Sequence, residues 1–234
     1  MGKDKYLNLV DYYDVESPEA SEFRRLLHNL NGLKSPQNKR TILVTSSMVS
    51  EGKSLISSFL AITAARHKGR KTLLIDFDLR RPTIHKLFGL SREKGIAEVL
   101  LDGAAVRTAV KQTALEKLDI LTAGRHLENP SDIINGPIIH KLLEELKFYY
   151  ELILIDTSPV VPVSDPLILM DEVDGVLLVV KAGSTPRGVI TRTTGLLARQ
   201  KEKILGVVVN NLTHSLPYYY NYNYYGYNYS PTKE

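Results

Sequence analysis

The sequence contains no cysteine and no tryptophan among its 234 residues. Without cysteine the chain can form neither a disulfide nor a thiolate metal site, so nothing in it requires an oxidising compartment. No apolar run approaches the roughly 20 residues of a membrane-spanning helix, and residues 1–10 lack the apolar core of a signal peptide. We therefore expect a soluble, cytoplasmic protein that reaches the inner face of a membrane only through a partner.

Charge and histidine are too few or too scattered to indicate several other classes of function. The net charge of +4 at pH 7 is mild and diffuse, so nucleic-acid binding is not expected. The six histidines show no ligand spacing, which argues against a metal other than Mg²⁺. Apolar residues make up 43% and charged residues 24% of the chain, values that fit one large globular domain.

The N-terminal part of the sequence predicts a flexible segment followed by a helix. Residues 1–16 are polar with scattered tyrosines, and we expect them to be loosely ordered. The helix should begin at Pro18 with Ser17 as its N-cap. Apolar residues then recur at helical spacing as far as Leu30, and Gly32 suits the end of the helix.

Short apolar runs alternate with helical patterns through the rest of the chain. Several runs are apolar without alternation, as expected of strands buried on both faces of a parallel sheet. The predicted strands are 41–45, 72–75, 118–121, 152–155, 176–180 and 205–209. The predicted helices are 53–67, 95–101, 137–148 and 185–200. This alternation predicts an α/β fold with a mostly parallel sheet flanked by helices on both faces.

A phosphate-binding loop lies between the strand at 41–45 and the helix that begins near Lys53. Residues 47–54 read Ser-Met-Val-Ser-Glu-Gly-Lys-Ser, which fits the P-loop pattern except that serine replaces the first glycine. Free backbone N–H groups at a helix N-terminus bind phosphate, Lys53 should reach the β- and γ-phosphates, and Ser54 should ligate Mg²⁺. The predicted nucleotide-binding residues here are Ser47, Met48, Val49, Ser50, Glu51, Gly52, Lys53, Ser54 and Leu55.

Carboxylates follow two of the predicted strands. Asp76 and Asp78 come directly after one strand, and Asp156 follows another. Ligands of open α/β sheets bind beyond the carboxyl ends of the strands, so these side chains should converge with the phosphate loop. Mg²⁺ commonly uses one or two carboxylates together with phosphates and water, and Asp156 is the best candidate. Taken singly, each aspartate could equally belong to a solvated strand-to-loop turn.

Eight tyrosines crowd into the C-terminal stretch with only asparagine and glycine between them. These spacers are poor helix and strand formers, so we expect a mobile tail over 217–234 that follows a folded domain over 17–216. Phenol hydroxyls beside bound ATP indicate a kinase that modifies itself, although an aromatic end that stacks on a partner is an alternative. The candidate autophosphorylation sites are Tyr218, Tyr219, Tyr220, Tyr222, Tyr224, Tyr225, Tyr227 and Tyr229.

These motifs occur in the order found in the bacterial tyrosine kinases (BY-kinases) that control exopolysaccharide and capsule synthesis. The sequence resembles that family over about residues 17–229, including the Asp-Phe-Asp-Leu-Arg-Arg-Pro motif at 76–82. The resemblance implies a fold of the P-loop NTPase type, with Lys53 on phosphate and with Ser54, Asp76 and Asp156 handling the metal directly or through water. Asp76 and Asp78 would orient and deprotonate the incoming tyrosine, whose free phenol has a pKa near 10.

The resemblance extends to two further places and departs from the family in two. Glu22, Arg25 and His28 match a helix pattern that helps subunits form a ring, although an arginine is expected at position 28. Asn210 stands where similar proteins bind the adenine edge, with a simple strand-end turn as the alternative. The usual Pro-Gly before the loop glutamate is replaced by Val49-Ser50, which leaves the nucleotide affinity open.

The resemblance also implies partners. These are a membrane-embedded activator with a cytosolic tail, sister subunits in a ring such as an octamer, tyrosine-containing protein substrates and a cognate phosphatase. We expect each tail to be phosphorylated in trans by a neighbouring subunit. Two alternatives remain. One is an ATPase switch of the septum-site or partition type, although Met48 replaces the signature lysine of those proteins. The other is a non-catalytic scaffold.

Overall fold

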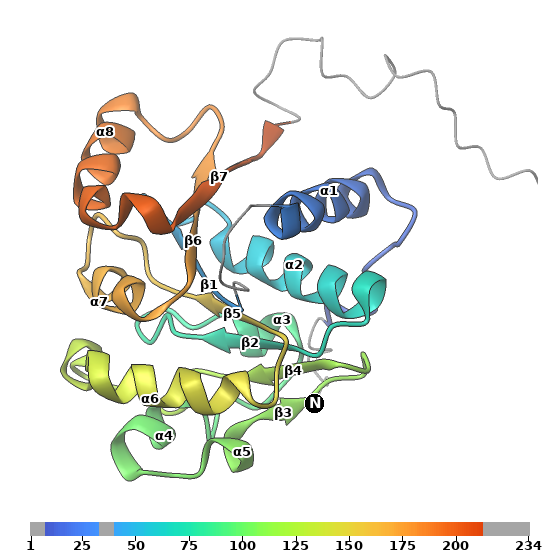
Figure 1. The fold of residues 1–234 in the computed structure, drawn as a ribbon, viewed down its shortest axis with the longest axis vertical. Coiled ribbons are helices and arrows are strands. Elements are labelled where there is room, and N and C mark those ends of the chain that lie inside the picture. The colour runs from blue at the N-terminus through green and yellow to red at the C-terminus, as the bar shows by residue number, and fades with distance from the viewer. Residues whose placement is uncertain (1–7, 33–39, 213–234) are drawn as a thin grey trace, which may run out of the picture.

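The computed structural model describes residues 8–32 and 40–212, which form a sheet between two layers of helices (Figure 1). The sheet has the order β3-β4-β2-β5-β1-β6-β7, and every neighbouring pair is parallel except β3 and β4. The tail tyrosines lie outside the described residues. The strands are β1 (Thr41–Ser46), β2 (Thr72–Asp76), β3 (Lys111–Gln112), β4 (Leu118–Leu121), β5 (Leu152–Asp156), β6 (Gly175–Lys181) and β7 (Ile204–Asn210).

Helices cover both faces of this sheet. Figure 1 shows α1 and α2 on one side and α6, α7 and α8 on the other, so the predicted architecture is confirmed. The α-helices are α1 (Pro18–Gly32), α2 (Lys53–Lys68), α3 (Ile84–Leu87), α4 (Ile96–Asp102), α5 (Val106–Ala109), α6 (Gly136–Lys147), α7 (Asp165–Glu172) and α8 (Arg187–Leu196). Two 3₁₀ helices are η1 (Pro130–Ile133) and η2 (Ala198–Lys203).

Two apolar cores lie on the two faces of the sheet, and they explain the continuous apolar runs in the strands. Successive side chains of a strand point to opposite faces. Accordingly Leu43 of β1 belongs to the core beneath α6 and α7, whereas Ile42 and Val44 belong to the core beneath α2. A strand buried in this way has no polar face, because both faces of a parallel sheet are covered by helices.

The predicted strands all form and extend by at most one residue at either end. The N-cap of α1 is also confirmed, because the Ala20 N–H donates to Ser17 Oγ at 3.1 Å. The predicted helix at 185–200 is interrupted, since α8 ends at Leu196 and a 3₁₀ turn follows. Gly195 weakens the helix there. The sequence did not predict α3, α5, α7 or β3, most of which are too short to show a period.

Residues 8–16 pack against the body of the protein, unlike the loosely ordered segment that the sequence predicted. Leu9, Val10 and Tyr13 are buried. The Leu9 N–H donates to the Leu87 carbonyl at 2.8 Å, and the Tyr13 hydroxyl lies 2.8 Å from Thr63 Oγ1 in α2. These apolar side chains stand among polar neighbours without a period, so their burial could not be seen in the sequence.

Candidate active site

The predicted site residues converge at one edge of the sheet, where the parallel strands end. β1 leads into the phosphate loop, β2 and β5 end at Asp76 and Asp156, and β7 ends at Asn210. Asp76 and Asp156 are direct partners in the register of β2 and β5. Because parallel strands end at the same edge, residues that are far apart in the sequence meet around the start of α2.

The phosphate loop turns sharply through two residues with positive φ. Ser50 has φ 64° and Gly52 has φ 90°, and α2 begins at Lys53. A non-glycine residue such as Ser50 costs about 1–2 kcal/mol in this conformation. Glycine suits the φ of Gly52, and a Cβ there would lie 2.2 Å from the side-chain nitrogen of Asn210, which would have to move. The loop therefore has the turn that aims the amides of the first turn of α2 at an anion.

Glu51 holds the loop in this shape. Its side chain is buried, and one carboxylate oxygen accepts the Met48 N–H at 2.7 Å. The Thr185 hydroxyl, from the segment between β6 and α8, donates to the other oxygen. The Asn210 side-chain amide donates to the Glu51 carbonyl at 2.9 Å. Thus two residues predicted to bind nucleotide, Glu51 and Asn210, brace the phosphate loop in this structure, together with Thr185, which sequence reasoning missed.

Lys53 is paired with Asp78 at the base of the loop. Lys53 Nζ lies 2.9 Å from Asp78 Oδ2, and both side chains are largely buried. Burial acts to lower the pKa of Lys53, but the carboxylates of Asp156, Asp78 and Asp76 outweigh it and raise that pKa. Burial likewise acts to raise the pKa of Asp78, yet Lys53 holds it below its usual value. The pair is therefore fully charged at neutral pH.

Ser158 supports the same carboxylate from the end of β5. Its hydroxyl donates to Asp78 Oδ1 at 2.9 Å, and the Arg81 N–H donates to that oxygen at 3.1 Å. The sequence offered only a weak signal for this serine, namely its place two residues after Asp156. Asp78 is therefore oriented by groups from two different loops.

Asp76 is turned toward the segment that precedes and opens α3. Asp76 Oδ2 accepts the N–H groups of Thr83 and Ile84 at 3.1 and 3.0 Å. Its pKa lies well above the usual value, first because the group is fully buried and second because of the charge of Asp156. Two of the hydrogen bonds that would stabilise Asp76 are thus already formed within the chain.

Asp156 differs from the other two carboxylates because neither of its buried oxygens accepts a hydrogen bond of normal geometry among the described residues, although the hydroxyls of Ser54 and Ser57 lie near enough to act on its pKa. Burial raises its pKa to about 6, while the charge of Lys53 opposes that rise. A buried carboxylate without a partner is costly unless a cation or water meets it. No group of three His, Cys, Asp or Glu side chains within residues 8–32 and 40–212 could hold a metal by itself. This set fits Mg²⁺, which takes few protein ligands and completes its shell with phosphate and water.

Arg80 is held by an ion pair and a hydrogen bond within the protein. Its Nε lies 3.2 Å from Asp165 Oδ2, and a second guanidinium nitrogen donates to Ser131 Oγ at 2.6 Å. Ser131 in turn donates to Asp165 Oδ1 at 2.6 Å. Arg80 therefore ties the loop after β2 to η1 and α7, two elements that the sequence did not predict.

The residues predicted for subunit contact lie apart from this site, on α1. Arg25 and Glu22 form an exposed ion pair at 2.6 Å. An open groove of about 490 Å³ runs along this helix and is lined by Ser21, Arg24, Arg25, His28 and Asn29. The spacing therefore places Arg25 and His28 beside one groove, as the helical period predicts.

Comparison with known proteins agrees with this geometry. The family model described as ParA, NUBPL iron-transfer P-loop NTPase, matches residues 37–224. Tyrosine-protein kinase YwqD of Bacillus subtilis is 31% identical over 203 residues, which cover 87% of this chain and 85% of that protein. The putative tyrosine-protein kinase CapB of Staphylococcus aureus is 32% identical over 88% of this chain and 91% of its own length.

Solved structures that are similar to this chain include a tyrosine-kinase domain. The kinase domain of the Escherichia coli tyrosine kinase ETK has a TM-score of 0.82 and 26% identity, with 95% of this chain and 88% of that chain covered. The chimerical protein CapA2B2 has a TM-score of 0.79 and 30% identity over 86% of this chain and 88% of its own. The septum-site-determining protein MinD from Pyrococcus horikoshii, solved with Mg-ADP, is 23% identical with a TM-score of 0.63, so it shares the fold.

Membrane-crossing helices are not found in the part of the chain that the structure describes. There, no helix combines the length and the apolar character needed to cross a bilayer.

Proposed function

The chain belongs to the bacterial tyrosine-protein kinases, and from this premise we propose that it transfers the γ-phosphoryl group of ATP to tyrosines of its C-terminal tail. One observation carries this proposal. The start of α2, the Lys53–Asp78 pair and the buried carboxylate of Asp156 meet at one edge of the sheet. Phosphoryl transfer depends mostly on positioning and charge neutralisation, which this arrangement offers.

In the proposed complex, the amides of residues 47–55 and Lys53 hold the phosphates. Asp156 and Ser54 ligate Mg²⁺ directly, and Asp76 acts through water because its Oδ2 already accepts two N–H groups. Bound Mg²⁺ supplies charge neutralisation between the phosphates and the carboxylates. Asn210, whose side chain lies beside Gly52, binds the adenine edge of the nucleotide in this proposal.

Nucleotide binding changes the partner of Lys53 in this proposal. In the structure Lys53 pairs with Asp78 at 2.9 Å. When Lys53 moves to the phosphates, the Asp78 carboxylate is released to accept the phenolic proton. The phenolate oxygen then attacks the γ-phosphorus, the bond to the bridging oxygen breaks and ADP leaves. Asp76 helps to orient the tyrosine. A carboxylate base is needed because a free phenol has a pKa near 10.

The tail is phosphorylated in trans within a ring of subunits such as an octamer, with Glu22, Arg25 and His28 at the contact. A membrane-embedded activator brings the cytoplasmic kinase to the membrane, and a phosphatase reverses the reaction. Likeness to CapB and similar kinases supports a role in exopolysaccharide or capsule synthesis. Each phosphate adds about −1.5 to −2 charges at pH 7, so repulsion would open a fully phosphorylated ring.

The test is incubation with ATP and Mg²⁺, followed by mass mapping of phosphotyrosine. Modification should fall on the cluster between Tyr218 and Tyr229 and should vanish in Lys53→Met and in Asp76→Ala. Phosphate incorporation unchanged in both variants would contradict these roles. ATP turnover without any modified tyrosine would indicate the ATPase switch instead, and failure to bind ATP would indicate a scaffold.

The trans reaction has its own test. The Lys53→Met protein, which keeps its tail, is mixed with an active protein that ends at residue 216. Phosphotyrosine should then appear on the Lys53→Met chain. If that chain stays unmodified while the full active protein modifies itself, phosphorylation occurs within one subunit.

A further inference from the structure

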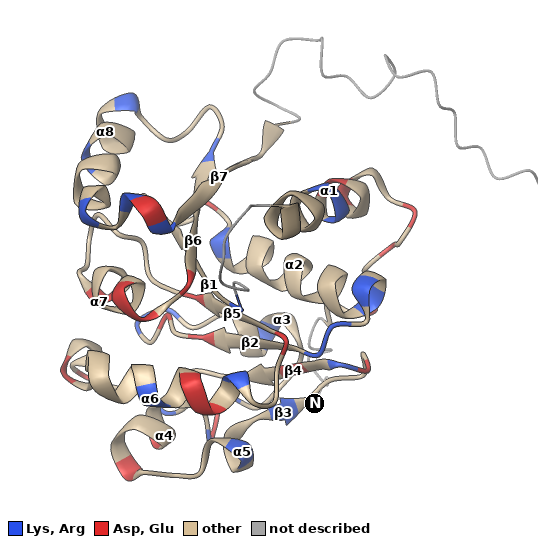
Figure 2. Ribbon diagram, in the orientation of Figure 1, with Lys and Arg blue, Asp and Glu red and all other residues tan. Residues whose placement is uncertain are grey.

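A basic groove lies at the edge of the sheet opposite the active site, where β1, β2 and β5 begin. It is open and has a volume of about 730 Å³. Figure 2 shows Lys and Arg at the C-terminal end of α2 and again at the start of β2. The cationic residues that line the groove are Arg40, Lys68, Arg70, Lys71 and Lys147. Among its described lining residues, only Glu151 is acidic.

Much of this positive charge is not neutralised. Within residues 8–32 and 40–212, neither Lys68 nor Lys71 makes an ion pair, and both are exposed. Burial lowers the pKa of Arg70, the carboxylate of Glu151 opposes that shift, and the charge of Arg40 adds to it. The two guanidinium groups are thus close enough to repel, and a bound anion would relieve that repulsion.

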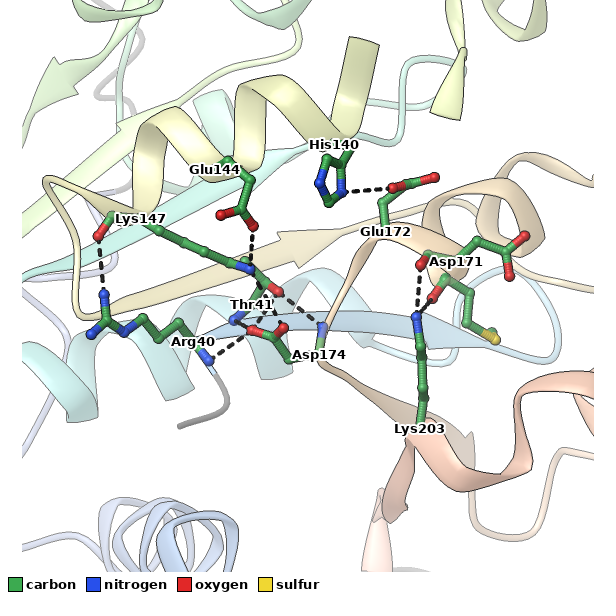
Figure 3. Close-up of polar contacts among 10 residues, drawn as sticks. Arg40, Thr41, His140, Glu144, Lys147, Asp171, Glu172, Asp174 and Lys203 are labelled. Carbon is green, nitrogen blue, oxygen red and sulfur yellow. Dashed lines mark hydrogen bonds and ion pairs between the residues drawn. The ribbon is translucent and has the colours of Figure 1, made fainter. Parts of the chain in front are cut away.

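The backbone and neighbouring side chains hold several of these cations in place. Arg70 donates to Asn31 Oδ1 at 3.1 Å and to the Glu151 carbonyl at 2.8 Å. Figure 3 shows Arg40 donating from its side chain to the Lys147 carbonyl, and Lys147 reaching Glu144 and Asp174. A groove with fixed cations loses little side-chain entropy when an anion binds.

Aromatic side chains stand among the cations. Phe148 is 86% exposed and Tyr149 is 41% exposed, whereas aromatic side chains are usually more buried than this. Lys71 Nζ lies 5.5 Å from the centre of the Tyr150 ring. The groove therefore offers both cations for an anion and ring surface for an aromatic group. An aryl phosphate presents both features in one side chain.

We propose that this groove binds the phosphorylated tyrosine tail of this chain, from the same subunit or a neighbour. The proposal rests on the proposed kinase function for the origin of the phosphates. Residues 213–232 contain no Asp, Glu, Lys or Arg, so the tail has no charge to attract the groove until it is phosphorylated. Each phosphotyrosine then adds about −1.5 to −2 charges at pH 7.

The length of the chain allows this contact. Residues 213–229 could span roughly 56 Å when extended, at about 3.3 Å per residue. A seven-residue strand such as β7 spans only about 23 Å, so a tail that starts beyond β7 can reach the opposite edge of the sheet. Bound there, a phosphorylated tail would stay away from the active site and leave it open to an unmodified one.

A binding measurement with the full-length protein tests the groove. The protein is treated with a tyrosine phosphatase and kept free of ATP, and a labelled synthetic peptide of residues 213–234 is titrated with it by fluorescence anisotropy. The peptide with phosphotyrosine at positions 224 and 225 should bind about tenfold or more tightly than the unmodified peptide, because its phosphates form charge-assisted contacts with the cations of the groove. Its affinity should fall with added salt.

Two variants with the same change in charge give the decisive comparison. Lys68→Gln/Lys71→Gln should weaken phosphopeptide binding about tenfold. Arg192→Gln/Lys201→Gln, in α8 and η2 on the other side of the molecule, should leave it unchanged. Circular dichroism and thermal melting confirm that both variants fold, and the neutral exchanges Lys68→Met and Lys71→Met repeat the test.

Three results would overturn the proposal. Equal affinities of the two double variants would show that only net charge matters. Displacement of the phosphopeptide by ADP would place it in the active site. Binding of phosphatidylglycerol vesicles through Lys68 and Lys71, without binding of the phosphopeptide, would identify a lipid surface. Because the peptide carries its phosphates already, its binding does not depend on catalysis. If the protein binds the phosphopeptide but modifies no tyrosine, the groove proposal holds and the proposed kinase function is contradicted.

Discussion

The two edges of one parallel sheet differ in charge and in burial. At the carboxyl ends of the strands, three aspartates surround Lys53 in a buried site. At the amino ends, five basic residues line an open groove. The same buried strands connect the two edges, so the length of the sheet separates the anionic site from the cationic groove. Interactions between charges are strong at the first edge because it is buried, whereas solvent and salt screen them at the second. Mutations at the first edge should therefore change catalysis strongly, whereas mutations at the second edge should have smaller effects on stability and binding.

Asp156→Asn should have the largest effect and should separate activity from stability. The exchange removes a buried carboxylate that accepts no hydrogen bond of normal geometry among the described residues, so thermal stability should stay equal or rise. Tail phosphorylation should fall by about 100-fold or more, since a metal-ligating charge is lost. Thermal melting and a phosphotyrosine assay measure the two effects. A large fall in melting temperature would show that Asp156 stabilises the resting fold.

Glu51→Gln should have the next largest effect, because it weakens the brace of the phosphate loop. The amide keeps one acceptor oxygen but cannot accept both the Met48 N–H and the Thr185 hydroxyl as the carboxylate does. We expect the KM for ATP to rise about tenfold with a smaller change in kcat, a loss of about 1.4 kcal/mol. Thr185→Val should act in the same direction. Unchanged KM values in both variants would show that Glu51 and Thr185 do not hold the phosphate loop in its binding shape.

Asp174→Asn tests the opposite edge, where one carboxylate joins the starts of β1 and β6. Asp174 Oδ2 accepts the N–H groups of Arg40 and Thr41 and the Thr41 hydroxyl, at 2.8–2.9 Å (Figure 3). The exchange should lower the free energy of unfolding by about 1–3 kcal/mol, with kinase activity retained. Urea unfolding and the phosphotyrosine assay check both parts.

The contribution of Asp174 should also depend on pH. Burial acts to raise its pKa, but the Thr41 N–H and hydroxyl and the Arg40 N–H outweigh it and hold the pKa below its usual value. A depressed folded-state pKa means that the stabilisation is fully present above the unfolded value. It is lost as the pH falls through the lower folded value. The difference between wild type and Asp174→Asn should therefore be constant near neutrality and shrink below about pH 4.

Lys147→Met should have the smallest effect. Lys147 pairs with Glu144 at 2.8 Å and reaches Asp174 at 3.5 Å near the surface. Such pairs contribute about 0–1 kcal/mol, so the urea midpoint should move little. Phosphopeptide affinity at the groove should fall only about two- to threefold. A loss as large as that of Lys68→Gln/Lys71→Gln would show that the groove is centred on α6.

Local signals in the sequence predicted much of this molecule. The apolar runs around Leu43 and Leu154 are buried on both faces, and Ser17 caps α1. The phosphate loop and the acidic strand ends meet because parallel strands end together. These features depend on residues close in sequence or on a general rule of sheet topology. For that reason they could be predicted without knowledge of side-chain contacts.

Contacts between distant segments could not be predicted. Thr185 meets Glu51 across 134 residues, and Arg80 meets Asp165 across 85. A lone threonine or aspartate carries no pattern that marks such a contact. The adenine-binding role expected of Asn210 stays a prediction, and its bond to the Glu51 carbonyl depends on how β7 ends beside the loop.

The contact between Asn210 and the phosphate loop has a mechanical consequence. Gly52 leaves room for the Asn210 side chain directly above the turn, and β7 ends at Asn210. A pull on the chain beyond Leu212 would therefore reach the nucleotide cradle through one amide group. A partner that binds the chain beyond Leu212 could therefore act on the phosphate loop through the contact of Asn210 with this loop.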